Sequence, residues 1–306
     1  MREEVFLILP ERLKIAIKNI GGSSTITEIR LRAFKKVIVL LGTQEVELEV
    51  IITLEEILQI LVAVSKNSIY AIQQDINNGF IVIPGGHRIG VCGEVVTQDS
   101  KIKNIKNINS MNIRIARQVI GCADVVMQHI LNNGRIRNTL IISPPGCGKT
   151  TILRDTIRQL SNGTDTFRGV NVSVVDERGE IAAVSQGIAN LDVGCRTDVM
   201  SNVKKSLGIQ LLVRSMAPSV IATDEIGSDE DIEEIKYAAL SGVSMIFTMH
   251  GNDIGDLYKK SRIKELIDLN IFELAIFLSN KKGVGTIEKI YLLDDKNKEG
   301  KVACLL

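Results

Sequence analysis

The segment Thr139–Leu160 reads TLIISPPGCGKTTILRDTIRQL and joins a short apolar run to a helical pattern. Its middle part, Ser143–Thr150, has the glycines and the Gly-Lys-Thr ending of a phosphate-binding loop, set between a strand and a helix as such a loop requires. Backbone N–H groups at a helix N-terminus bind phosphate oxygens well, because the helix dipole favours anions there. The segment therefore predicts a nucleotide-binding α/β domain.

Each position of this loop has an expected task. Gly146 and Gly148 let the backbone wrap closely around phosphate, Lys149 reaches the β- and γ-phosphates, and the Thr150 hydroxyl binds Mg²⁺. Ser143 stands where the first glycine is usual, so the turn must accept a Cβ there. An ordinary glycine-rich turn is the alternative. The residues expected to bind ATP and its Mg²⁺ are Pro145, Gly146, Cys147, Gly148, Lys149, Thr150 and Thr151.

The composition excludes several kinds of protein. The 306 residues include 37 Lys and Arg against 36 Asp and Glu, so the chain has no overall attraction for nucleic acid. Aromatic residues make up 4% of the chain, which excludes stacking on bases or sugars as its main chemistry. Its five scattered cysteines favour reduced thiols. Since no apolar run reaches the ~18 residues of a membrane span, we expect a cytoplasmic protein, soluble or peripherally attached to a membrane.

The pattern of apolar residues changes near Gly121. Residues 1–120 alternate short helical and strand patterns, which predicts a smaller α+β domain. Residues 121–306 alternate strands with helices, which predicts a parallel sheet with helices on both faces. In the first part the expected helices are Glu11–Ile20, Leu54–Val64 and Ser68–Asn77, and the expected strands are Ile26–Leu31, Lys36–Leu41 and the hairpin Phe80–Ile83 with Ile89–Val96. In the second part the expected strands are Thr139–Ile142, Val172–Val175, Val220–Thr223 and Val243–Thr248, and the expected helices are Lys149–Leu160, Ser201–Met216 and Glu230–Leu240.

The segment Ser100–Ala123 contains no acidic residue. Its cations are Lys101, Lys103, Lys106, Arg114 and Arg117. We expect an extended strand that leads into a linker. Two interpretations stay open: a solvated basic strand at the edge of a sheet, which would discourage edge-to-edge pairing, or a surface that faces phosphate.

Acidic residues follow two of the expected strands. Val220–Thr223 is followed by Asp224, which we expect to bind Mg²⁺ through water, and by Glu225, which we expect to orient or deprotonate the attacking water. This strand should neighbour the strand of the phosphate loop. Val172–Val175 is followed by Asp176, Glu177 and Glu180. That group is either part of the ligand-binding edge of the sheet or an exposed loop whose charges neutralise one another.

His250 follows the strand Val243–Thr248 at the same edge. We interpret it as a sensor of the γ-phosphate or a polar bridge, with a purely structural histidine as the alternative. The polar loop Asp192–Asp198 precedes the next helix, and its Arg196 either contacts phosphate or pairs with a nearby aspartate. No spacing of His and Cys indicates a zinc site.

Seven motifs occur in one order along the chain: Glu28–Arg32, Gly79–Gly93, Ser143–Thr151, Val174–Ile181, Leu191–Val199, Val213–Gly227 and Ile246–Gly251. In this combination the chain resembles the stage III sporulation protein AA family over nearly its whole length. That family is similar to the ATPases of type II and type IV secretion systems, which form hexamers of RecA-like domains.

This resemblance implies an ATPase that energises or assembles a channel complex between mother cell and forespore in endospore formation. It implies a homo-oligomer, a hexamer, that works with membrane-embedded channel proteins from the mother-cell side of the membrane. Asp176–Glu180 would correspond to the acidic box of the secretion ATPases, and His250 to their histidine box. Arginines of the first domain or of a neighbouring subunit would close on the phosphates. The candidates are Arg30, Arg32, Arg88 and Arg114, each equally explained by a local salt bridge.

We therefore expect ATP hydrolysis in which Lys149, the loop amides and Mg²⁺ neutralise the phosphates and Glu225 positions water. Two other functions stay open. A RecA-like DNA translocase or helicase would use the same nucleotide site, but only the basic segment could bind a strand, and the nucleic-acid signal is not strong. A scaffold that binds ATP without hydrolysing it is the other alternative.

Overall fold

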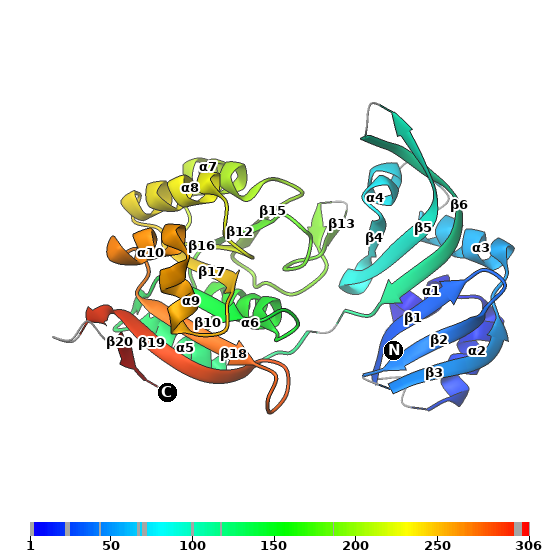
Figure 1. Cartoon of the computed structure of the whole chain (residues 1–306), viewed down its shortest axis with the longest axis horizontal. Helices are drawn as coiled ribbons and strands as arrows, with labels where there is room; N and C mark the ends of the chain where they lie inside the picture. The colour runs from blue at the N-terminus through cyan, green and yellow to red at the C-terminus, as the bar shows by residue number, and fades with distance from the viewer. Residues whose placement is uncertain are drawn as a thin grey trace. The chain divides into compact units, whose positions relative to one another are not determined.

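The computed structural model describes residues 3–21, 25–42, 44–65, 68, 72–98, 101–116, 118–185, 187–296 and 302–305. The chain forms two compact units, coloured along the sequence in Figure 1. The first comprises Met1–Arg117 and Ala183–Asn190, and the second comprises Gln118–Ala182 and Leu191–Leu306. A short hairpin from the middle of the sequence therefore groups with the first unit. None of the helices in the described ranges is long and apolar enough to cross a membrane.

The first unit is built on an antiparallel sheet in the order β3-β2-β1-β6-β5-β4. Its strands are β1 (Ile26–Arg32), β2 (Lys36–Leu41), β3 (Gln44–Ile51), β4 (Phe80–Ile83), β5 (His87–Gln98) and β6 (Lys101–Arg114). Its helices are α1 (Glu3–Ile8), α2 (Glu11–Asn19), α3 (Leu54–Val64) and α4 (Gln73–Asn77), with a 3₁₀ turn at Pro84–Gly86. The hairpin that groups with it is β13 (Val184–Ser185) and β14 (Ile188–Ala189).

Most of the elements expected here are present, and the expected hairpin is the pair β4–β5. The structure adds α1 and β3, which were not expected. Of the helix expected at 68–77, the described residues form only α4, and residues 69–71 lie outside the described ranges. The helix α3 begins where expected, because Thr53 and Glu56 form a reciprocal capping box.

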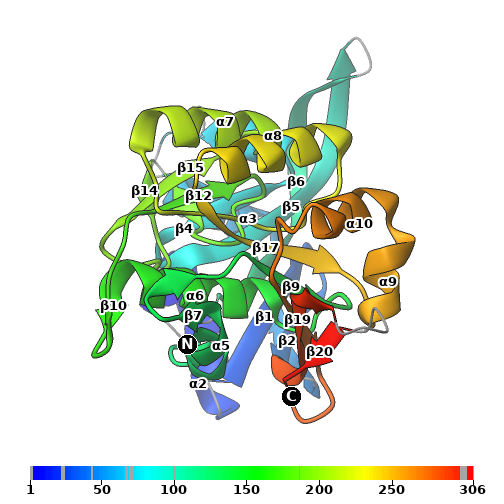
Figure 2. The ribbon, with the colours of Figure 1, turned by 90° about the vertical axis from the view of Figure 1, so that its left-hand side faces the viewer.

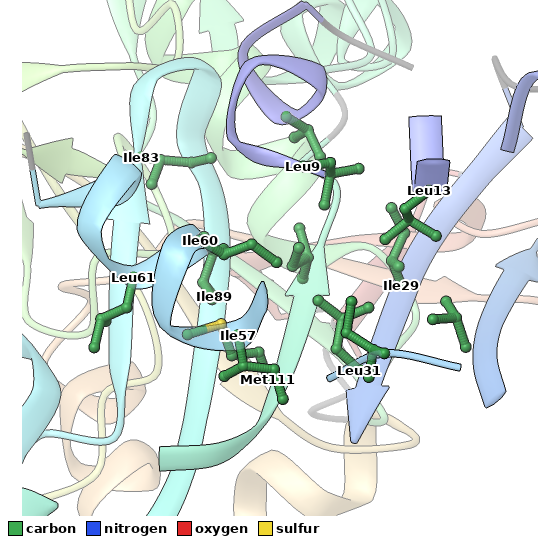
Figure 3. Close-up of a cluster of buried hydrophobic side chains, with 14 of the residues drawn as sticks. Leu9, Leu13, Ile29, Leu31, Ile57, Ile60, Leu61, Ile83, Ile89 and Met111 are labelled. Atoms are coloured by element: carbon green, nitrogen blue, oxygen red, sulfur yellow. The ribbon is translucent and has the colours of Figure 1, made fainter. Parts of the chain in front are cut away.

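Alternating side chains of the sheet face the helices and form one apolar core, shown in Figure 3. The members labelled there are Leu9, Leu13, Ile29, Leu31, Ile57, Ile60, Leu61, Ile83, Ile89 and Met111. All of them are buried. Aliphatic residues thus build this core in a chain that has no Trp.

The basic strand β6 corrects one expectation. It pairs with β5 along its length and with β1 over residues 110–114, so the edges of the sheet are β3 and β4. The interpretation of the basic segment as an edge strand is therefore wrong for residues 110–114, whereas residues 101–106 pair with β5 alone. Its first half continues with β5 as a two-stranded ribbon beyond β1 (Figure 1). Charge alone could not reveal this, because the order of strands is set by long-range pairing. Arg117 lies outside the described ranges.

The second unit contains a sheet in the order β15-β12-β16-β17-β9-β18-β19-β20. The first six strands are parallel, and β19 and β20 are antiparallel additions. Their bounds are β9 (Thr139–Ser143), β12 (Val172–Asp176), β15 (Thr197–Ser201), β16 (Val220–Thr223), β17 (Ser244–His250), β18 (Leu274–Ser279), β19 (Thr286–Lys296) and β20 (Val302–Cys304). Two small hairpins are β7 (Leu131–Asn132) with β8 (Arg135–Ile136) and β10 (Gly163–Thr164) with β11 (Phe167–Arg168).

Helices cover both faces of this sheet. They are α5 (Asp124–Ile130), α6 (Lys149–Asn162), α7 (Lys205–Met216), α8 (Asp229–Leu240), α9 (Ile254–Lys259) and α10 (Ser261–Asp268). Figure 2 shows α7 and α8 along one face and α5 and α6 along the other. Every residue of β9, β12 and β16 is buried, as expected for parallel strands covered twice. The expected α/β architecture, a parallel sheet preceded by an α+β unit, is confirmed.

Two details of this sheet differ from expectation. The segment 192–198 was expected to be a loop, but Thr197 and Asp198 begin β15, which pairs with β12. The strand β16 was expected beside β9, but β17 lies between them. Hydrophobic patterns locate strands along the chain, whereas their order in the sheet depends on how the helices cross over it.

The close packing of β5 on β6 predicts that Gly93 does not tolerate a side chain. A Cβ there would lie 2.5 Å from the Lys106 carbonyl oxygen and 2.9 Å from the Ile108 Cα, which are both backbone atoms. We expect Gly93→Ala to lower the free energy of unfolding by roughly 1–3 kcal/mol, measured by urea unfolding. Gly90→Ala on the same strand is the control, since its Cβ would meet nothing closer than 3.8 Å. Equal effects of the two changes would contradict this account.

Candidate active site

The expected phosphate loop connects β9 to α6. Gly146 and Gly148 have φ angles of +74° and +86°, in the left-handed region that residues with a Cβ rarely adopt. Ser143, which replaces the usual glycine, is not among the described residues with positive φ, so its side chain causes no backbone strain. It is buried, and its hydroxyl donates to the Pro144 carbonyl at 2.7 Å. The departure at Ser143 therefore leaves the loop conformation intact.

The Lys149 ammonium is buried against this loop. Its Nζ donates to the carbonyl oxygens of Ser143 at 2.9 Å and Pro144 at 3.1 Å, and lies 2.9 Å from Nδ1 of His250. Burial lowers the pKa of Lys149, and the negative charge of Glu225 opposes that effect. Lys149 is thus positioned at the start of α6 by oxygens that phosphate oxygens could replace.

The carboxyl ends of the parallel strands bring the other expected residues to the same edge. His250 at the end of β17 is the register partner of Ser143 at the end of β9. Asp224 and Glu225 follow β16, the next strand along, and Asp176 ends β12 beyond it. Ligands of parallel sheets bind at this edge.

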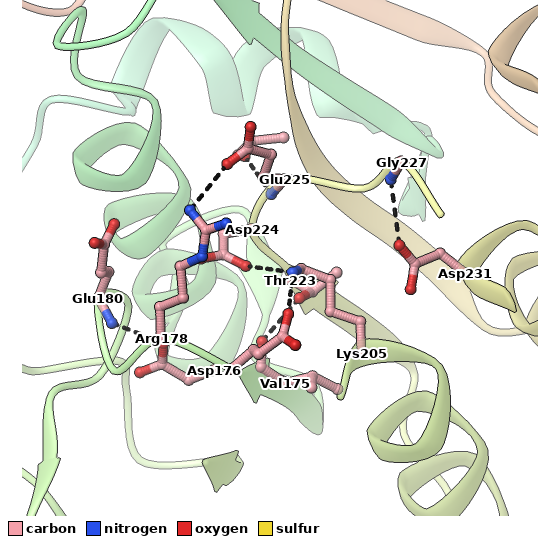
Figure 4. A network of polar contacts seen from close by, with 12 residues as sticks. Val175, Asp176, Arg178, Glu180, Lys205, Thr223, Asp224, Glu225, Gly227 and Asp231 are labelled. Atoms are coloured by element: carbon pink, nitrogen blue, oxygen red, sulfur yellow. Dashed lines mark hydrogen bonds and ion pairs between the residues drawn. The ribbon is translucent and has the colours of Figure 1, made fainter. Parts of the chain in front are cut away.

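Glu225 is held between two cationic or polar side chains. One carboxylate oxygen lies 2.8 Å from Nε2 of His250. The other lies 3.3 Å from Nη1 of Arg178, as Figure 4 shows. The Glu225 amide donates to the Thr248 hydroxyl at 2.9 Å. Successive contacts connect four side chains, in the order Lys149, His250, Glu225 and Arg178. His250 therefore bridges the phosphate loop and the carboxylate.

Asp224 is 5% exposed, and its Oδ1 has no hydrogen-bond partner among the described residues. This oxygen lies 3.5 Å from the Lys205 ammonium (Figure 4). Burial raises the pKa of Asp224 to about 6, although the charge of Lys205 pulls it in the other direction. The Oδ1 atom of Asp224 is thus a buried acceptor that a bound cation could contact.

Lys205 is a charged member of the site that sequence reasoning missed. Burial lowers its pKa, but its contact with Glu177 and the charge of Asp224 outweigh burial and hold the pKa above the usual range. A lysine in the first turn of a helix is usually solvated, so nothing in the sequence marked it. Of the expected acidic group, Glu177 is therefore paired with a buried lysine.

Asp176 organises the loop that follows β12. It is fully buried, and its carboxylate accepts hydrogen bonds from the amides of Glu180 at 2.8 Å, Ile181 at 3.1 Å and Ala182 at 2.9 Å. Arg154, a buried residue of α6 that sequence reasoning also missed, donates to the carbonyls of Glu180 and Ile181. One interpretation of this segment was an exposed loop whose charges neutralise one another. Asp176 does not fit that interpretation, because it is buried and bound by backbone amides.

The four arginines expected to form a clamp all lie on the antiparallel sheet of the first unit. Arg30 on β1 pairs with Glu28. The Arg88 guanidinium on β5 lies 3.4 Å from the centre of the Phe80 ring. Arg114 on β6 is the register partner of both Glu28 and Arg88. Arg32 and Arg30 line a hollow of about 420 Å³ on this sheet. Arg196, the other candidate, donates to the Ser161 carbonyl at 2.9 Å.

The two sheets together define the fold of an ATPase of the secretion and pilus-motor type. The structure resembles that of the Legionella pneumophila ATPase DotB, with a TM-score of 0.59 and 13% identity over 97% of this chain and 80% of that one. It also resembles the pilus retraction motor PilT with bound ADP, with a TM-score of 0.57 and 16% identity over 87% of this chain and 76% of that one. At these identities the likeness establishes the fold.

The sequence identifies the family. The family model for sporulation stage III, protein AA matches residues 1–299. Stage III sporulation protein AA of Bacillus subtilis (strain 168) is 38% identical over 290 residues, which is 94% of each chain. The chain belongs to the stage III sporulation protein AA family, as the motifs indicated.

The raised pKa of Asp224 predicts that ionisation of this side chain lowers the stability of the fold. Between about pH 4 and pH 6 the folded protein keeps a proton on Asp224 that the unfolded chain releases, so stability falls as pH rises through this window. We expect Asp224→Asn to raise the free energy of unfolding by roughly 1–3 kcal/mol at about pH 7.5, in urea unfolding without nucleotide or Mg²⁺. The gain should shrink near pH 5. Asp229→Asn, at an exposed aspartate, is the control. An Asp224→Asn protein less stable than wild type at neutral pH would refute this account.

Proposed function

We propose that this chain hydrolyses ATP at the loop 143–151. The observation that carries the proposal is the line of contacts from Lys149 through His250 to Glu225, which joins a phosphate-binding loop to a carboxylate at one edge of the sheet. Backbone amides at the start of α6 and the Lys149 ammonium would bind the β- and γ-phosphates. The ADP bound to PilT, which shares this fold, supports a nucleotide as the ligand.

The residues present fit a magnesium ion that enters with the nucleotide. Among the described residues, no three His, Cys, Asp or Glu side chains gather to bind a metal on their own. Thr150 in the first turn of α6 and Asp224, whose buried Oδ1 has no hydrogen-bond partner among the described residues, would hold Mg²⁺ against the phosphates. When bound, the ion supplies positive charge to the transferring phosphoryl group.

Glu225 would orient the attacking water or accept its proton. Its carboxylate is fixed by His250 on one side and Arg178 on the other, so its position beyond β16 is defined before substrate binds. His250 contacts both Lys149 and Glu225, so it would report the arrival of phosphate at the lysine to the carboxylate. The acidic group would support this arrangement, with Glu177 holding Lys205 and Asp176 holding its loop.

Membership of the family and the fold shared with a pilus motor support a wider role. The chain would form a hexamer on the cytoplasmic, mother-cell side of the membrane and energise or assemble the channel to the forespore through membrane-embedded partners. The first 120 residues would act as the domain that closes over the nucleotide. Its clamp would be Arg30, Arg32, Arg88 and Arg114.

Two substitutions separate binding from hydrolysis. Lys149→Ala should weaken ATP binding and lower turnover by roughly 100-fold or more, because the phosphates lose a buried cation. Glu225→Gln should keep ATP affinity but lower turnover by roughly 100-fold or more, because water loses its base. Turnover is measured as phosphate release and affinity by calorimetry.

The matched controls are Lys264→Ala on α10 and Glu233→Gln on α8, both at exposed side chains that form local ion pairs. They should hydrolyse ATP at the wild-type rate. Undiminished turnover in the Lys149 or Glu225 variants would reject the catalytic assignment. Binding without turnover in the assembled wild-type protein would instead favour the non-hydrolysing scaffold.

The oligomeric state provides a separate test. We expect sedimentation velocity to show a larger assembly in the presence of Mg²⁺-ATP, most persistent in the Glu225→Gln protein, because bound nucleotide would join neighbouring subunits. Turnover per chain should fall on dilution below the assembly range. A monomer whose turnover per chain is constant on dilution would rule out a site shared across a ring.

A further inference from the structure

We propose that the base of the bound nucleotide rests on the loop between β18 and β19, residues 280–285, with the Val284 side chain as its apolar contact. This inference rests on the proposed function, since it assumes a nucleoside triphosphate at the phosphate loop. It names the part of the chain that binds the nucleoside half of that ligand.

The order of strands determines on which side of the phosphate loop the base lies. The strand β9 has β17 on one side and β18 on the other. The groups that must face the γ-phosphate, His250 and Glu225, follow β17 and β16, on the first side. The nucleoside is attached at the opposite end of the triphosphate. It must therefore extend toward the β18 side, where the loop 280–285 begins.

This loop contacts the phosphate loop directly. The Gly285 amide donates to the Cys147 carbonyl at 3.1 Å. A Cβ on Gly148 would lie only 2.9 Å from Cγ1 of Val284, so the two segments pack as closely as a glycine allows. Gly285 also lies over Ile152 of α6. The β18–β19 loop thus adjoins the N-terminus of α6, next to the place expected for the α-phosphate.

Polar contacts fix the conformation of the loop. The Ser279 hydroxyl donates to Glu288 at 2.5 Å and accepts from the Lys281 amide at 3.1 Å. The Lys281 ammonium pairs with the other Glu288 oxygen at 3.0 Å. At the far end, the Thr286 hydroxyl donates to the Gly283 carbonyl at 2.6 Å. A flat ligand would therefore meet a formed surface and would not need to order a loose loop.

Val284 is 71% exposed although it sits on this ordered loop. An apolar side chain beside a phosphate site gains free energy when a base covers it, through burial and dispersion. A purine face suits such a contact, and an aliphatic side chain reads none of the hydrogen-bonding atoms on the edge of a base. The Val284 contact therefore gives affinity for the base with little discrimination between adenine and guanine.

The test compares two ligands that share phosphates and differ in the nucleoside. Calorimetry in Mg²⁺ gives the Kd of ATP and of inorganic tripolyphosphate for wild type and for Val284→Ser. We expect the serine variant to bind ATP roughly five-fold more weakly and tripolyphosphate with unchanged affinity. Leu240→Ser is the matched control, because Leu240 is an exposed apolar residue (89%) at the end of α8, which precedes β17 and so lies at the other edge of the sheet.

The outcomes separate this inference from the proposed function. An unchanged ATP affinity in Val284→Ser, with binding abolished in Lys149→Ala, would overturn the base contact and leave the phosphate site standing. An equal loss for ATP and tripolyphosphate would also overturn it, since Val284 would then act through the phosphate loop. Failure of wild type to bind either ligand would reject both proposals.

Discussion

Charge buried at one edge of the parallel sheet is the constraint around which the second unit is arranged. Lys149, Asp176, Lys205 and Asp224 are all buried there, and each charge needs compensation inside the protein. Loop carbonyls and His250 compensate Lys149, three amides compensate Asp176, and Glu177 compensates Lys205. Asp224 is compensated least, because its Oδ1 has no hydrogen-bond partner among the described residues, and burial raises its pKa to about 6. The site therefore has one carboxylate whose charge becomes favourable when a cation binds.

The position of β17 explains how the phosphate loop and the carboxylate are joined. Because β17 separates β9 from β16, Lys149 and Glu225 do not follow neighbouring strands. His250 ends the intervening strand and contacts both of them, through one ring nitrogen each. Thr248, two residues earlier on the same strand, accepts from the Glu225 amide. The strand β17 thus sets the distance between Lys149 and Glu225. A change in the hydrogen-bond partners of Lys149 would alter the position of His250 and, through it, the contact with the Glu225 carboxylate.

The sequence predicted the elements of the fold better than their arrangement. The run from Thr139 to Leu160 and the apolar strands were recognisable, because local hydrophobic patterns and a glycine-rich loop identify them. The pairing of β6 on both sides, the place of β17 and the start of β15 at Thr197 depend on long-range contacts that no local pattern encodes. The same holds for Lys205 and Arg154, whose burial follows from packing. Asp224 and Glu225 could be proposed from the sequence only because a phosphate loop precedes them.

Asp176 also anchors the turn at which the chain leaves the second unit. Its carboxylate binds the amides of residues 180–182, and Arg154 holds two carbonyls of the same turn, so this turn is fixed to β12 and α6. At Ala183, which has a φ of +49°, the chain passes into the hairpin of the first unit. The fixed turn ends one residue before that crossing. The last anchored amide, that of Ala182, is therefore followed directly by the residue at which the chain enters the first unit.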